Sequence, residues 1–306
     1  MNRELLIALP GNEALADALA GARSAERGAV AVRRFPDGEV YVRLECDVAG
    51  RDVALVGTLH EPDDKVLPLV MLAEAARDLG ARRVGLVAPY LCYMRQDARF
   101  REGEGITSLY FARFLSRVVD WLVTVDPHLH RHGTLAESGY TIPARVVHAA
   151  PALAAWIREH VARPVLVGPD AESEQWVRAV AELAVVPHIV LEKVRRGDRD
   201  VDVSVPQVER WRDHTPVLVD DIISTARTMT ETLGHLRRAG MAPAVCVGIH
   251  AVFAGDGYEA LQAAGPARIV TCNSIPHPTN AVDLSPSLAA AVEDLIVQGA
   301  EEAESP

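Results

Sequence analysis

The segment "VLVDDIISTARTMTETL" at 217–233 combines an apolar run, two adjacent carboxylates and several hydroxyls. Asp220 and Asp221 end the apolar run, and Ser224 and Thr228 follow where a helix begins. Adjacent carboxylates can accept hydrogen bonds from sugar hydroxyls or hold a hydrated Mg²⁺. The free N–H groups of a helix N-terminus suit a phosphate monoester. The segment therefore predicts a ribose-phosphate site, and the alternative is a strand end followed by an ordinary helix cap.

Short aliphatic runs alternate with amphipathic helical patterns along the chain and would position this segment. Strands are predicted at 52–57, 83–90, 121–126, 164–170, 188–194, 216–222, 244–250 and 267–273. Helices are predicted at 66–80, 108–119, 173–184 and 228–240. Such alternation indicates an α/β protein with parallel sheets that are covered by helices on both faces. Ligands of these sheets bind beyond the carboxyl ends of the strands, where the two aspartates are expected.

The length of 306 residues favours two domains, since a domain has about 150 residues on average. The boundary is expected near 143–150, which gives an N-terminal domain at 1–146 and a C-terminal domain at 147–306. Both halves show the same rhythm of strands and helices, which suggests a duplicated architecture. The last helix is a candidate to pack back on the first domain.

Charge and cysteine usage exclude several classes of protein. A net charge of −11 argues against nucleic acid held on a broad basic surface. The four cysteines are scattered without a CxxC pair, so neither a zinc site nor a disulfide framework is indicated. We expect no membrane segment, because no apolar run reaches the roughly 18 residues that spanning needs and no leader opens the chain. A cytoplasmic protein is the simplest expectation.

Five further motifs carry chemistry: "RRFPDGEVYVRL" (33–44), "APYLCYMRQDARF" (88–100), "VTVDPHLHRH" (123–132), "VGPDAESEQW" (167–176) and "VLEKVRRGDRDVDVSV" (190–205). With the Asp-Asp segment, their order resembles that of the ribose-phosphate diphosphokinase (phosphoribosyl pyrophosphate synthase) family, over about 33–289. The resemblance implies two similar phosphoribosyltransferase-like domains, each a mostly parallel sheet flanked by helices. The first would carry the ATP loops, and the second the ribose 5-phosphate loop and a catalytic arm.

The resemblance implies roles for the residues of the first half. Phe35 would stack on adenine, and Asp37 and Glu39 would accept hydrogen bonds from its amine. Arg95 would contact the ATP phosphates and Gln96 the nucleotide. The other residues implied in ATP binding are Asp97, which would hold the site together, and Arg99. From the residues alone, "PDG" could be a plain turn with Phe35 in the core, and Arg-Gln-Asp could be a surface turn.

In the second half the resemblance implies a mobile arm at 190–205, followed along the chain by the 5-phosphate loop. The residues implied for ribose 5-phosphate are Asp220, Asp221, Ser224, Thr225, Ala226, Arg227 and Thr228. Ala226 and Arg227 stand where the family has glycines, which removes the residue type that reaches positive φ most easily. Lys193 and Arg195 would be the catalytic cations of the arm. A solvated hairpin is the alternative for this arm.

The resemblance also implies Mg²⁺ as the cofactor, with His128 and Asp170 as candidate metal ligands. Glu172 and Ser173 replace two family glycines next to Asp170. The implied reaction transfers the diphosphate of ATP to the C1 hydroxyl of ribose 5-phosphate and releases AMP. It also implies a homo-oligomer whose adenine site lies at a subunit interface. The alternatives are a catalytically impaired regulatory relative and a phosphoribosyltransferase that consumes the product.

Overall fold

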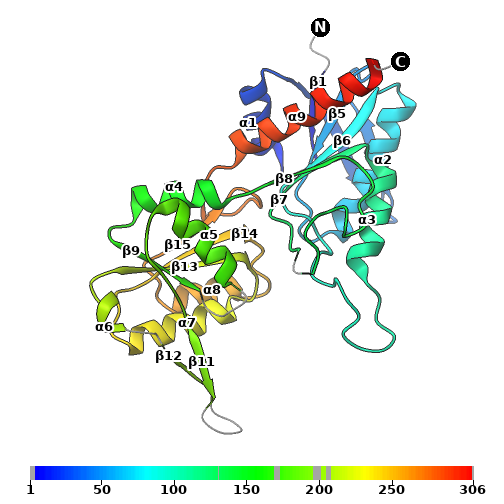
Figure 1. The fold of residues 1–306 in the computed structure, drawn as a ribbon. Coiled ribbons are helices and arrows are strands. Elements are labelled where there is room, and N and C mark those ends of the chain that lie inside the picture. Colours follow the sequence, from blue (N-terminus) through cyan, green and yellow to red (C-terminus); the bar gives the residue numbers. More distant parts are fainter. Residues whose placement is uncertain (1–3, 130, 169–172, 196–200, 205–207, 305–306) are drawn as a thin grey trace. The chain divides into compact units, whose positions relative to one another are not determined.

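A computed structural model describes residues 4–129, 131–168, 173–195, 201–204 and 208–304 (Figure 1). The chain divides into two compact units. Unit 1 runs to Val147 and includes the C-terminal helix that begins at Ser285, and unit 2 is His148–Leu284. Each unit is an α/β layer structure around its own parallel sheet.

Unit 1 contains a six-stranded sheet in the order β2-β1-β5-β6-β7-β8, in which all neighbours are parallel. Its elements are β1 (Glu4–Ala8), α1 (Glu13–Arg23), β2 (Glu26–Gly28), β3 (Val30–Arg34), β4 (Val40–Leu44), β5 (Asp52–Val56), α2 (Asp63–Asp78), β6 (Arg83–Ala88), α3 (Thr107–Val118), β7 (Trp121–Val125), β8 (Ala144–Val147) and α9 (Ser285–Glu304). Strands β3 and β4 form a separate antiparallel hairpin. The central strands are buried along their whole length, which explains their unbroken aliphatic sequences.

Unit 2 contains a second six-stranded parallel sheet in the order β10-β9-β13-β14-β15-β16. Its elements are α4 (Ala150–His160), β9 (Pro164–Gly168), α5 (Glu174–Ala184), β10 (His188–Val190), β11 (Glu192–Arg195), β12 (Val201–Ser204), α6 (Val208–Trp211), β13 (Thr215–Ile223), α7 (Arg227–Arg238), β14 (Val245–Ala251), α8 (Gly257–Ala263), β15 (Arg268–Cys272) and β16 (Asn280–Val282). Strands β11 and β12 again form a separate antiparallel hairpin.

The two sheets share one topology. Ranked along the chain, both have the strand order 2-1-3-4-5-6, and both insert the hairpin between the second and third strands of the sheet. This confirms the predicted α/β fold with two similar domains. The prediction of a single strand at 188–194 was wrong, because this segment contains two strands, β10 and β11. The amide of Leu191 still bonds to the Gly168 carbonyl, but the next residues leave the sheet to pair with β12.

The C-terminal helix α9 covers one face of the unit 1 sheet beside α1 (Figure 1). In unit 2 the helix α4, which precedes the first strand, packs beside α5 in the corresponding way. In unit 1 α9 thus supplies the cover that α4 supplies in unit 2. Three arginines fix it: Arg23 donates to the Ala289 carbonyl (3.1 Å), Arg83 to the Ile296 carbonyl (3.1 Å) and Arg145 to Gln298 (3.0 Å).

No helix in the described segments combines the length and apolar composition that crossing a bilayer requires.

The packing of Trp121 against Gly85 gives a prediction about the unit 1 core. These residues face each other on β6 and β7, and a Cβ on Gly85 would lie 1.8 Å from the indole. We expect Gly85→Ala to lower the free energy of unfolding by about 1–3 kcal/mol or more, measured in urea. Gly21→Ala in α1, where nothing lies within 4 Å, is the matched control. It should raise stability by roughly 0.5–1 kcal/mol. Equal effects of the two changes would contradict the packing of Trp121.

Candidate functional site: the carboxyl edges of the two sheets

The aspartate pair of unit 2 lies near the point where the strand order reverses. Strand β13 pairs with β9 on one side and with β14 on the other. Because β9 connects to β10 in one direction and β13 connects to β14 in the other, the loops after β9 and β13 diverge there. Such a switch point is where open α/β sheets bind ligands. Asp220 and Asp221 are half-buried residues in the last part of β13.

Backbone amides fix both carboxylates. The Asp221 amide donates to Asp220 Oδ1 (3.0 Å), and the Ile222 amide donates to Asp221 Oδ1 (2.8 Å). Two adjacent carboxylates of this kind can accept hydrogen bonds from vicinal hydroxyl groups.

The loop after β13 turns into helix α7 through a left-handed residue. Ala226 has φ 54° and ψ 11° and occupies the N-cap position of α7. Its carbonyl accepts the amide of Thr230 (2.8 Å), which closes the first helical turn. An alanine side chain has no acceptor, so it cannot cap the first amides of α7. The N-terminus of α7 thus has backbone donors and a positive dipole end that suit an anion.

Two close backbone contacts support this loop. The Phe253 amide donates to the Ile223 carbonyl (2.8 Å), which links the ends of β13 and β14. A Cβ on Gly257 would lie 2.4 Å from the Ser224 carbonyl oxygen, so the start of α8 lies directly against the loop backbone. Only glycine fits there without moving the loop.

Three rings gather beyond β14 and β15, next to the same loop. The centroid of Phe253 lies 5.1 Å from that of Tyr258 and 4.6 Å from that of His277. His277 also bonds to the Thr279 hydroxyl (2.8 Å), and burial lowers the pKa of its imidazole. This cluster was not predicted, because it joins the segment after β14 to the loop after β15, which are distant in the sequence.

The arm expected at 190–205 is the antiparallel hairpin of β11 and β12. Lys193 pairs with Val203, and Arg195 with Val201. The side chains of both cations lie outside what the structure describes, as do Asp170 and Glu172 entirely. Their proposed roles therefore rest on the sequence motif.

In unit 1 the expected adenine motif forms the turn of the β3–β4 hairpin. The Phe35 amide donates to the Glu39 carbonyl (2.8 Å), and the Gly38 amide donates back to the Phe35 carbonyl (2.9 Å). Asp37 accepts the Glu39 amide (3.2 Å). Phe35 is 39% exposed, so it is not a core residue. Asp37 and Glu39 are exposed as well.

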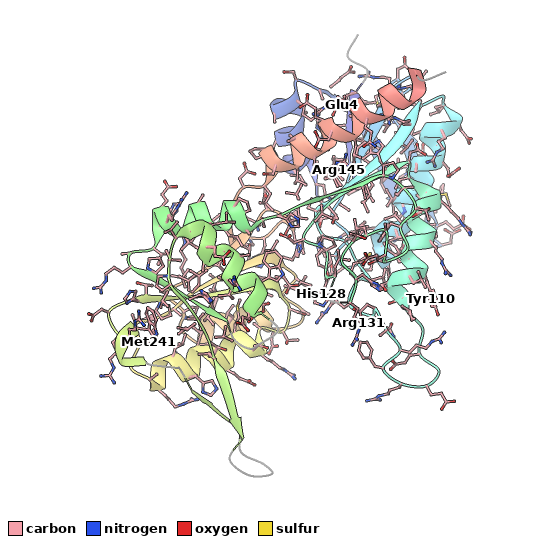
Figure 2. The ribbon with its side chains drawn as sticks, in the orientation of Figure 1. Glu4, Tyr110, His128, Arg131, Arg145 and Met241 are labelled. Carbon is pink, nitrogen blue, oxygen red and sulfur yellow. The ribbon has the colours of Figure 1, made fainter. Side chains whose placement is uncertain are left out.

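The loops after β6 and β7 leave the unit 1 sheet at the same edge, because the two strands are parallel neighbours. This brings Asp97 to Arg131, with 3.3 Å between Oδ1 and Nε, although 34 positions separate them. The Asp97 side chain is only 8% exposed. His128, also in the second loop, is half-buried (Figure 2). Arg131 was not predicted as a site residue, since nothing local to it signals a distant partner.

The remaining predicted residues of the first loop have separate surroundings. Gln96 accepts the Thr107 hydroxyl (3.2 Å), which ties the loop to the start of α3. Arg99 donates to the Glu104 carbonyl (3.1 Å), and Arg95 is exposed. Burial raises the pKa of the Cys92 thiol to about 12, so it is not a nucleophile at neutral pH.

Adjacent aspartates at the start of α2 connect the hairpin with this loop. Asp64 pairs with Arg34 of the hairpin (2.7 Å), and Asp63 accepts the Tyr93 hydroxyl (2.9 Å). The hydrogen bond to Asp63 raises the pKa of Tyr93. The hairpin and the loop after β6, which both carry predicted ATP-binding residues, therefore contact the same end of α2.

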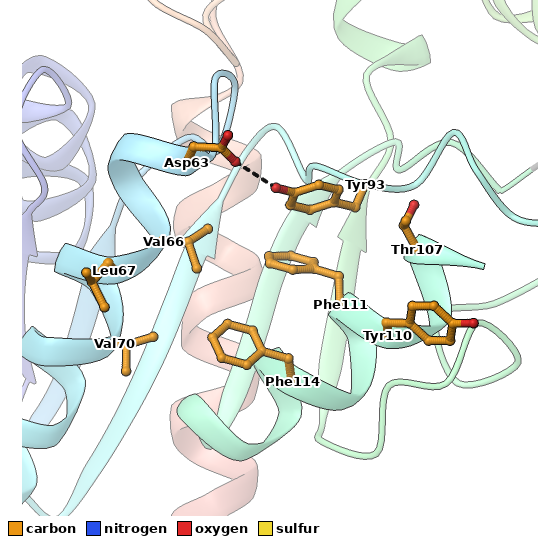
Figure 3. Close-up of a pocket in the computed structure, with 9 residues that line it drawn as sticks. All are labelled: Asp63, Val66, Leu67, Val70, Tyr93, Thr107, Tyr110, Phe111 and Phe114. Carbon is orange, nitrogen blue, oxygen red and sulfur yellow. Dashed lines mark hydrogen bonds between the residues drawn. The ribbon is translucent and has the colours of Figure 1, made fainter. Parts of the chain in front are cut away.

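A largely apolar hollow of about 600 Å³ lies between α2 and α3 (Figure 3). Val66, Leu67 and Val70 line it from α2, and Phe111 and Phe114 from α3. None of the predicted site residues lines it. Among the described residues, no three His, Cys, Asp or Glu side chains are grouped so that they could hold a metal ion.

Comparison with known proteins agrees with this architecture. Residues 5–118 match the model of the N-terminal domain of ribose phosphate pyrophosphokinase, and 140–287 match a phosphoribosyl transferase domain. The phosphoribosylpyrophosphate synthetase structure from Mycobacterium smegmatis superimposes with a TM-score of 0.82 over 97% of this chain and 100% of that one, at 24% identity. The fold is therefore that of two phosphoribosyltransferase-like domains in one chain.

Sequence relatives narrow the assignment. A ribose-phosphate pyrophosphokinase of Methanopyrus kandleri is 34% identical over 90% of this chain and 94% of the relative. The protein of that name from Saccharolobus solfataricus is 32% identical over 79% of this chain and 82% of its own length. The chain belongs to the ribose-phosphate pyrophosphokinase family of enzymes.

The conformation of Ala226 yields a prediction about the loop. A left-handed residue costs an L-amino acid about 1–2 kcal/mol, a penalty that glycine avoids. We expect Ala226→Gly to change the free energy of unfolding little, or to raise it, because relief of this strain offsets the lost methyl burial and the added chain entropy. Ala239→Gly, at a right-handed position at the end of α7, should lower stability by about 0.5–1 kcal/mol. Urea unfolding measures both, and equal losses would contradict a left-handed Ala226.

Proposed function

We propose that this enzyme makes 5-phosphoribosyl 1-diphosphate and AMP from ribose 5-phosphate and ATP, in a Mg²⁺-dependent reaction. The observation that carries the proposal is the arrangement at the switch point of the unit 2 sheet. There, two amide-fixed carboxylates are followed within a few residues by a helix N-terminus without a side-chain cap. The names of the sequence relatives support the same reaction class.

The unit 2 residues would bind the sugar phosphate at its two ends. Asp220 and Asp221 would accept hydrogen bonds from the ribose hydroxyls. The loop at 224–228 and the first amides of α7 would hold the 5-phosphate, where the helix dipole favours negative charge. Arg227, exposed at the first position of α7, would add a cation to this cradle.

The unit 1 residues would bind the nucleotide. Phe35 would stack on adenine, while Asp37 and Glu39 would accept from its amine. Arg95 would bind the phosphates bidentately, and Gln96 would contact the nucleotide. Asp97 would act through Arg131, because their ion pair holds the two loops at the sheet edge together.

The chemical step needs alignment and neutralisation of charge more than covalent participation of the protein. The C1 hydroxyl oxygen attacks the β-phosphorus of ATP, and a new bond forms between them. The bond from that phosphorus to the bridging oxygen breaks, AMP leaves with this oxygen, and the hydroxyl proton is released. Lys193 and Arg195 would stabilise the negative charge on the transferred diphosphate and the departing α-phosphate.

The donor set fits Mg²⁺ held mainly by the substrates. Mg²⁺ usually uses one or two carboxylates together with phosphate oxygens and water. Asp220 and Asp221 supply carboxylates, and Asp170 and His128 remain candidates. When bound, the ion would neutralise phosphate charge and fix the orientation of the diphosphate.

A catalytically impaired regulatory relative is the second candidate, because glycines are missing from the loop. The backbone of Ala226 argues against it, since this residue reaches a left-handed conformation without glycine. A phosphoribosyltransferase would not need the ATP motifs of unit 1.

The proposal is tested by a ³¹P NMR time course with ATP, Mg²⁺ and ribose 5-phosphate. We expect AMP and a C1 diphosphate in equal amounts, and only with the sugar present. Lys193→Ala should lower kcat by about 100-fold or more, as loss of a transition-state donor does. Arg178→Ala, which removes an exposed cation of α5 paired with Glu182, is the matched control. If the protein binds ATP and ribose 5-phosphate but the ATP signals do not change, the result would favour a catalytically impaired regulatory relative.

We also propose a homo-oligomer with the adenine site at a subunit interface. Leu67, Tyr110 and Phe114 line the hollow between α2 and α3 and are exposed, and Met71 of α2 is exposed as well. An exposed apolar surface of this kind is typical of association sites. Charge supports a second copy as the occupant. Helix α2 carries four acidic and two basic residues, whereas α3 carries two arginines and no acidic residue, so the helices of two copies are complementary.

A charge in the hollow should therefore weaken association. We expect Phe114→Glu to shift the oligomer toward smaller species at micromolar concentration in sedimentation velocity, because an unpaired carboxylate would be buried. Leu183→Glu, at an exposed position of α5, is the control and should leave the oligomer intact. An unchanged assembly in Phe114→Glu would show that the contact lies elsewhere.

A further inference from the structure

One face of the β3–β4 hairpin carries an arginine between two aromatic residues. In the antiparallel register Arg33 lies directly opposite Tyr41. Phe35 lies two residues after Arg33, so it projects from the same face. The opposite face is apolar, and Val32 and Val42 pack there against the core of unit 1. The hairpin therefore presents these three side chains away from the core.

The guanidinium of Arg33 occupies the corner between the two rings. Its Cζ lies 4.7 Å from the Phe35 centroid and 4.1 Å from the Tyr41 centroid. The rings themselves are nearly perpendicular, at 87°, with centroids 5.9 Å apart. Both distances are within the range of cation–π attraction. Arg33 thus covers one face of Phe35 and holds the ring against Tyr41.

The neighbouring arginines have different partners. Arg34 pairs with Asp64 of α2, and Arg43 pairs with Glu45. The contacts that the structure describes for the Arg33 guanidinium are with the two rings. We therefore expect Arg33 to act on the hairpin through its contacts with Phe35 and Tyr41.

We propose that Arg33 is a positioning residue for the purine base of the nucleotide, an inference that rests on the proposed role of Phe35 in ATP binding. With one ring face covered by Arg33, the other face is presented in a fixed orientation to the base. Fixing a stacking group before binding lowers the entropy cost of association. Arg33 acts through Phe35 and contacts neither the phosphates nor the reacting atoms.

Calorimetric titration of the full-length protein with ATP and with tripolyphosphate separates a base effect from a charge effect. We expect Arg33→Met to lower the affinity for ATP about 3- to 10-fold, as loss of two cation–π contacts would. The affinity for tripolyphosphate should be unchanged. Arg33→Lys should be intermediate, because lysine keeps the charge without the planar group. Arg43→Met, which removes the same charge from the same hairpin, should bind ATP as the unchanged protein does. Turnover should show a raised KM for ATP with kcat preserved.

Phe35→Ala distinguishes the inference from the function on which it rests. We expect Phe35→Ala to lower the affinity for ATP by about 10-fold or more. Arg33→Met should have no further effect on ATP affinity in the Phe35→Ala background. Equal losses from Arg33→Met with and without Phe35, or weaker tripolyphosphate binding, would overturn positioning and leave Phe35 as a stacking residue. An unchanged ATP affinity in Phe35→Ala would overturn both roles. Failure to form 5-phosphoribosyl 1-diphosphate would overturn the proposed reaction only, since the titrations do not require turnover.

Discussion

Parallel pairing of buried strands is the constraint on which the rest of the structure depends. Because every strand of each main sheet runs the same way, all the loops that follow the strands leave at one edge. That edge collects Asp220, Asp221 and the loop of Ala226 in unit 2, and Asp97, His128 and Arg131 in unit 1. Covering both faces with helices then leaves the loop edge as the place where polar side chains can gather.

Because the two sheets share one topology, the two hairpins occupy equivalent positions in the fold. Each is inserted between the second and third strands of its sheet, where the chain crosses to the other side of the first strand. In unit 1 the hairpin carries Phe35 on a face turned away from the core. In unit 2 the corresponding hairpin carries Lys193 and Arg195. One architectural position thus offers an aromatic group to the nucleotide and cations to the phosphates under the proposed function.

One departure from the family motif, Ala226, is accommodated by the backbone around it. Ala226 adopts the left-handed conformation that glycine would reach at lower cost, and the hydrogen bond from Thr230 to its carbonyl helps to hold it there. Gly257 has no such freedom to change, since the Ser224 carbonyl leaves no room for a Cβ. The shape of the loop is therefore specified as much by its neighbour α8 as by its own sequence.

The sequence by itself determined the α/β class, most central strands and the motifs, because buried parallel strands and amphipathic helices leave strong periodic patterns. It also contained the alternation that puts Arg33 and Phe35 on one face. Only the tertiary structure decided which distant groups meet. The Asp97–Arg131 pair and the ring cluster of Phe253, Tyr258 and His277 depend on strand order and long-range packing. The break of 188–194 into two strands was likewise decided by pairing partners, which local apolar patterns do not encode.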